Sequence, residues 1–90
     1  MATHENALKA QRQAARRREV NRMRRARLRT AIKRLRATLD SGDAAAAREL
    51  LGSTLGIVDR SCKTGVIHPR NADRTKARLT RAYNRVAARA

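Results

Sequence analysis

The chain has 90 residues, which is enough for one small domain at most. Its 23 Lys and Arg residues against seven Asp and Glu residues give a formal net charge of +16, which favours a polyanionic partner and makes nucleic acid the default expectation. With no Trp or Phe and a single Tyr, the core must be thin, which argues against an enzyme because such a core cannot enclose a small-molecule substrate.

The first predicted helix covers residues 6–39. Ala, Arg and Leu dominate this segment, and the turn-forming residues Asp40-Ser41-Gly42-Asp43 follow it. At about 100° per residue, four apolar side chains near its end fall within an arc of roughly 60°. They are Leu28, Ile32, Leu35 and Leu39. We therefore expect the second half of this helix to face a core.

The first half of the same helix has a different pattern, because its charge is not confined to one face. Arginine side chains between residues 16 and 27 point to every side of the helical wheel, namely Arg16, Arg17, Arg18, Arg22, Arg24, Arg25 and Arg27. Packing any of these faces against protein would bury unpaired guanidinium groups at a high free-energy cost. We therefore expect this half to project from the bundle.

The second predicted helix covers residues 43–64 and differs in charge from both ends of the chain. Residues 37–69 carry three basic and four acidic residues, whereas residues 1–36 carry thirteen basic and two acidic ones. Asp43 can cap the helix, and apolar side chains recur at helical spacing. The expected core positions are Ala47, Leu50, Leu51, Leu55, Val58 and Cys62.

The third predicted helix covers residues 69–88. Gly65 suits the position just past the end of the preceding helix, and Pro69 suits the first position of this one. Its apolar stripe comprises Ala72, Leu79, Tyr83 and Val86. Opposite this stripe lies an arginine stripe, which consists of Arg70, Arg74, Arg78, Arg81, Arg85 and Arg89. A solvated face normally mixes both signs of charge, but Asp73 is the lone acid here, so we favour phosphate binding.

Together the three apolar stripes predict an all-α fold, a three-helix bundle with a long, basic, projecting first helix, formed by residues 1–90 as a single domain. Cys62 is the only cysteine, which excludes an internal disulfide, and His4 and His68 have no ligand partner at metal-binding spacing. We expect no metal and no cofactor. No apolar stretch approaches the roughly 20 residues that span a bilayer, so we expect no membrane association and a cytoplasmic location.

Several groups of residues resemble the bacterial small-subunit ribosomal protein S20 family. One group is Gly65-Val66-Ile67-His68 followed by Ala72, Arg74, Lys76, Ala77 and Leu79. Another is Asn21, Arg24, Arg25, Arg29, Thr30, Ile32 and Lys33, and a third is Gly42-Asp43 with Ala45-Ala46. The resemblance implies a ribosome-bound, non-enzymatic protein that binds 16S ribosomal RNA directly and supports subunit assembly. We expect no small-molecule substrate and no stable homo-oligomer.

Taken with the charge pattern, the resemblance implies a set of RNA-binding side chains on the first and third helices. The candidates are Lys9, Arg12, Arg16, Arg17, Arg18, Asn21, Arg22, Arg24, Arg25, Arg29, Lys33, His68, Arg70, Asn71, Arg74, Lys76, Arg78, Arg81 and Arg85. The main alternative is a nucleoid-type or regulatory DNA-binding protein. A helix-turn-helix protein, however, reads bases from one short recognition helix, whereas two separate helices carry the charge here.

Overall fold

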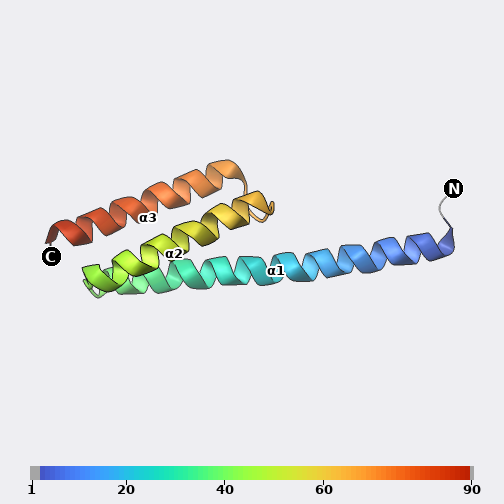
Figure 1. The fold of residues 1–90 in the computed structure, drawn as a ribbon, viewed down its shortest axis with the longest axis horizontal. Helices are drawn as coiled ribbons and strands as arrows, with labels where there is room; N and C mark the ends of the chain where they lie inside the picture. Colours follow the sequence, from blue (N-terminus) through green and yellow to red (C-terminus); the bar gives the residue numbers. More distant parts are fainter. Residues whose placement is uncertain (1–2, 90) are drawn as a thin grey trace.

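The computed structural model describes residues 3–89 as three helices joined by short turns (Figure 1). These helices are α1 (His4–Asp40), α2 (Ala44–Lys63) and α3 (Pro69–Arg89). No strand occurs in residues 3–89, and the predicted all-α, three-helix fold class is confirmed. Residues 1, 2 and 90 of the expected single domain lie outside this description. No helix within the described residues combines the length and apolarity needed to cross a membrane.

Side-chain caps and glycines set where the helices begin and turn. Thr3 Oγ1 accepts a hydrogen bond from the backbone N–H of Asn6 at 3.3 Å, so α1 begins two residues before the expected start. Asp43 Oδ1 caps α2 in the same way, accepting from the N–H of Ala46 at 3.1 Å. The two turns contain Gly42 and Gly65, whose φ angles of 79° and 78° lie in the left-handed region that favours glycine.

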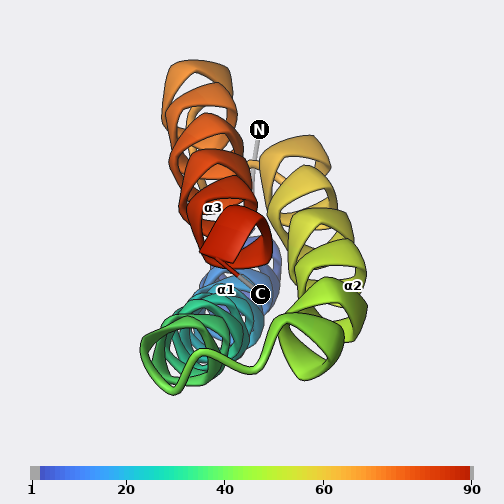
Figure 2. The ribbon, with the colours of Figure 1, turned by 90° about the vertical axis from the view of Figure 1, so that its left-hand side faces the viewer.

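The helices run up, down and up, and α2 is the middle element of the bundle. Its backbone approaches both neighbours closely at many positions, whereas the backbones of α1 and α3 approach each other closely at few. Seen end-on in Figure 2, the three helices form a triangle. Two groups of buried apolar side chains fill it. The first is Leu35, Leu39, Ala47 and Leu79, and the second is Leu28, Val58 and Ala72.

The buried face of α2 confirms the expected Ala47 and Val58 and adds two polar residues, Thr54 and Ser61. The fully buried positions of α2 are Ala47, Thr54, Val58 and Ser61. The expected Leu50, Leu51, Leu55 and Cys62 are only partly buried. At about 100° per residue, the four buried residues lie along the centre of the face and the larger ones flank it. Because α2 packs against two helices at once, the centre of its face is buried, and the flanking Leu50, Leu51 and Cys62 pack against the edges of the two core clusters.

The first half of α1 lies outside the bundle, which confirms the predicted projection. The first buried residue of α1 is Leu28, and nearly every side chain before it is exposed. Even the large apolar residues Leu8, Val20 and Met23 are 43, 38 and 53% exposed. As Figure 1 shows, this segment extends the molecule to 64 Å along its longest axis.

We expect the backbone amides of residues 4–25 to exchange without protection when no RNA is present. This part of α1 contains no buried side chain, and repulsion among its closely spaced arginines opposes the helix. Hydrogen exchange followed by NMR or mass spectrometry measures the effect, with residues 32–39 of the same helix as the internal control. Protection of the projecting segment equal to that of the control would contradict this expectation.

Candidate nucleic-acid interface

The projecting part of α1 presents positive charge on all sides. The candidate side chains Lys9, Arg12, Arg16, Arg17, Arg18, Arg22, Arg24 and Arg25 are all exposed, and Asn21 is half-buried. Within residues 3–89 the single salt bridge joins Lys76 to Asp59, so none involves these cations. Arg29 and Lys33 continue the exposed charge to the point where α1 enters the bundle.

The arginine stripe of α3 lies on the face opposite its buried side. All six arginines of the stripe are exposed, whereas Ala72 and Leu79 are 3 and 2% exposed. The core therefore holds one side of α3 in place and leaves the guanidinium groups outside. A guanidinium can bind a phosphate through two hydrogen bonds, so this face suits a nucleic-acid backbone.

Lys76 is placed differently from the other cationic candidates. Its side chain is 37% exposed, and its Nζ donates a 2.8 Å hydrogen bond to Asp59 Oδ1 on α2. This hydrogen bond and the charge of Asp59 raise the pKa of the Lys76 ammonium above its ordinary value. Lys76 is therefore engaged in linking α3 to α2, and its contact with RNA stays a prediction.

His68 and Asn71 lie at the start of α3. Both are exposed, and His68 Nδ1 accepts a 3.1 Å hydrogen bond from the backbone N–H of Arg70. In a neutral imidazole with Nδ1 as acceptor, Nε2 carries the proton and can donate to a ligand. His68 therefore caps α3 and keeps a donor for a partner, and both roles are compatible with each other.

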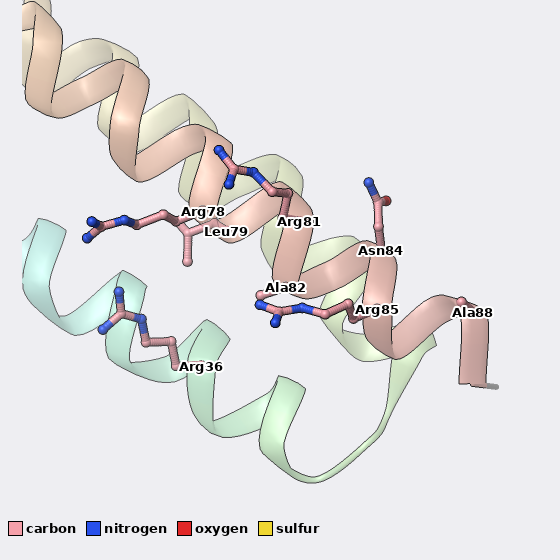
Figure 3. Close-up of a pocket in the computed structure, with 8 residues that line it drawn as sticks. All are labelled: Arg36, Arg78, Leu79, Arg81, Ala82, Asn84, Arg85 and Ala88. Carbon is pink, nitrogen blue, oxygen red and sulfur yellow. The ribbon is translucent and has the colours of Figure 1, made fainter.

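A groove between α1 and α3 brings together cations from two helices (Figure 3). It has a volume of about 730 Å³ and is lined by Arg36, Arg78, Leu79, Arg81, Ala82, Asn84, Arg85 and Ala88. Arg36 was absent from the residues expected from sequence. Its position on the helical wheel could have indicated this place. Arg36 lies about 40° beyond the edge of the apolar arc of α1, so it is next to the face that packs against the rest of the bundle.

A second, smaller groove lies between α1 and α2, where α1 leaves the bundle. Its volume is about 440 Å³, and the lining residues are Arg24, Arg27, Ile57, Arg60, Ser61, Lys63 and Thr64. Sequence reasoning missed Arg27, Arg60 and Lys63 as site residues. Residues 37–69 are nearly neutral overall, so their net charge gave no reason to single out Arg60 and Lys63. Both lie in the last turn of α2, where the helix dipole favours cations.

Comparison with known proteins identifies the family. Residues 2–84 match the family model described as ribosomal protein S20. A small ribosomal subunit protein bS20 from Geotalea uraniireducens is 44% identical over 84 residues, which cover 93% of this chain and 97% of that protein. The one from Shewanella frigidimarina is 42% identical, covering 98% of this chain and 100% of that protein. The chain therefore belongs to the ribosomal protein S20 family, which consists of ribosomal structural proteins and not of enzymes.

Proposed function

We propose that this protein is a structural constituent of the small ribosomal subunit, where it binds 16S ribosomal RNA directly and supports assembly of the subunit in the cytoplasm. The observation that carries the proposal is the distribution of charge over two helices. Arginines surround the projecting part of α1 and form one face of α3, and the described residues contain no salt bridge to any of them. Family membership over nearly the whole chain supports the same partner.

The two helices are suited to different RNA surroundings. The projecting part of α1 carries charge on every side, so it is complementary to a crevice in which phosphates approach from several directions. The stripe of α3 carries charge on one side only, so it is complementary to a single RNA backbone. Binding to RNA phosphates would remove the repulsion that the +16 charge causes in the free protein.

A folded rRNA partner and a DNA partner make different demands on α1. Linear duplex DNA can meet only one side of a straight helix at a time, whereas folded rRNA offers phosphates on several sides. We therefore expect much tighter binding to a folded small-subunit rRNA fragment than to duplex DNA of equal length, at the same salt concentration. Deleting residues 1–27 should remove this excess, because these residues carry the charge that surrounds the projecting part of α1. The bundle should remain folded, since the deletion ends just before the first buried residue, Leu28.

Fluorescence anisotropy titrations with both nucleic acids provide the measurement. Thermal melting of the deletion variant by circular dichroism is the control, since its bundle must still be folded for the comparison. Equal affinity for rRNA and DNA, or a preference that survives the deletion, would favour the DNA-binding alternative.

A further inference from the structure

Lys76 lies on a different side of α3 from the arginine stripe. At about 100° per residue, it is within roughly 60° of Ala72, Leu79 and Tyr83, which face the core, and about 120 to 180° from every arginine of the stripe. Its side chain is half-buried, and its Nζ lies 2.8 Å from Asp59 Oδ1 on α2. A nucleic acid bound to the stripe would therefore lie on the side of α3 that faces away from Lys76.

Few apolar side chains anchor α3 in the bundle. Within Pro69–Arg89 the buried residues are Ala72 and Leu79. Ala72 contributes a single methyl group, which packs in the cluster with Leu28 and Val58. Apolar contacts have no preferred direction, so they fix the rotation of a helix about its axis less sharply than a bond between two atoms does. The direction in which the arginine stripe faces therefore depends on more than the core.

Like charges oppose a close approach of α3 to α1. Arg36 of α1 and Arg78 and Arg85 of α3 line the groove between the two helices, and in Figure 3 their side chains extend into it. These cations repel one another, and the one salt bridge within residues 3–89 involves none of them. The backbones of α2 and α3 approach each other closely at many more positions than those of α1 and α3 do. The bundle therefore holds α3 chiefly through α2.

We propose that Lys76 is a positioning residue, which holds α3 against α2 through Asp59 so that the arginine stripe faces the RNA, and which does not contact RNA itself. This rests on the proposed RNA-binding function and gives Lys76 a role that differs from that of the arginines. The ion pair is partly exposed on both sides. Such pairs shift an equilibrium by no more than about fivefold, so the test relies on the direction of each effect.

The test titrates variants of the full chain with a folded small-subunit rRNA fragment. Asp59→Ala removes the partner of Lys76 without removing any cation. If Lys76 contacted a phosphate, this variant would bind RNA more tightly, because one negative charge is lost and Lys76 is released. Under the proposal it should bind about two- to fivefold more weakly than Glu49→Ala. Glu49→Ala is the matched control, since Glu49 is an exposed acid of the same helix that takes no part in the salt bridge.

Substitutions of Lys76 give a second readout. Lys76→Met removes the ammonium group but keeps a long side chain, whereas Lys76→Arg keeps a cation that can still bond to Asp59. Lys76→Met should weaken RNA binding by about two- to fivefold, and Lys76→Arg should bind like the wild type. The slope of log affinity against log salt should be the same in all three proteins. Loss of a phosphate contact would instead reduce the magnitude of that slope by about 0.7 to 1.

Asp59→Ala binding as tightly as Glu49→Ala or more tightly, or a reduced salt slope for Lys76→Met, would overturn the proposal. So would a lower melting temperature of these variants with unchanged affinity, because the ion pair would then serve stability alone. Circular dichroism melting verifies that each variant is folded at the temperature of the titration. If the wild type fails to bind the fragment, the proposed function itself is wrong. If the wild type binds and the variants behave otherwise than expected, only the role of Lys76 is wrong.

Discussion

Raising the salt concentration from 50 to 200 mM should weaken binding to a folded small-subunit rRNA fragment by roughly 10³- to 10⁵-fold, if the two basic helices contact about six to ten phosphates. Each neutralised phosphate releases condensed counterions, and added salt opposes that release. The α3 stripe alone presents six exposed arginines, and the projecting part of α1 presents more. Filter-binding or anisotropy titrations at several salt concentrations measure the slope of log affinity against log salt.

Single substitutions should show which arginines contribute to this slope. Arg74→Gln should reduce its magnitude by about 0.7 to 1, because one phosphate contact of the α3 stripe is lost. Arg48→Gln is the control, since Arg48 is an exposed arginine on α2 that lines neither basic groove and is followed by Glu49. If Arg48→Gln changes the slope as much as Arg74→Gln does, net charge and not the stripe determines binding.

The three helices could be predicted from the sequence because the signals that begin or end a helix are local. Asp43, Gly65 and Pro69 act through their own backbone geometry or through a hydrogen bond a few residues away. The exposure of the arginines was also predictable, since a guanidinium group without a partner is costly to bury. Both kinds of inference need only the properties of one helix.

Features that depend on a neighbouring helix could not be predicted in the same way. The burial of Thr54 and Ser61 follows from α2 packing against two helices, which the apolar pattern of α2 alone does not reveal. The bond between Lys76 and Asp59 joins residues 17 positions apart on separate helices. Arg36 becomes a groove residue only because α3 packs beside α1. Helical periodicity describes the faces of a helix but does not say which element covers each face.

Leu79→Ala should destabilise the bundle by about 2 to 5 kcal/mol, as is typical of truncating a buried leucine. Leu79 is 2% exposed and packs in one cluster with Leu35, Leu39 and Ala47. For a chain of this size, such a loss corresponds to a fall in melting temperature of roughly 10 °C or more. Thermal or urea unfolding followed by circular dichroism measures the change, and RNA binding should be retained at temperatures where the variant is folded.

Arg78→Ala is the matched comparison, because Arg78 is the preceding residue of the same helix and is exposed. The substitution removes one positive charge from a strongly basic molecule and no buried side chain from the core. The melting temperature of the free protein should therefore stay the same or rise. RNA binding should weaken, because Arg78 belongs both to the α3 stripe and to the α1–α3 groove. Leu79→Ala should thus lower stability and leave RNA binding intact, whereas Arg78→Ala should weaken RNA binding and leave stability intact. Unfolding of the Arg78→Ala variant would show instead that the stripe holds the bundle together, and its assignment to RNA would then fail.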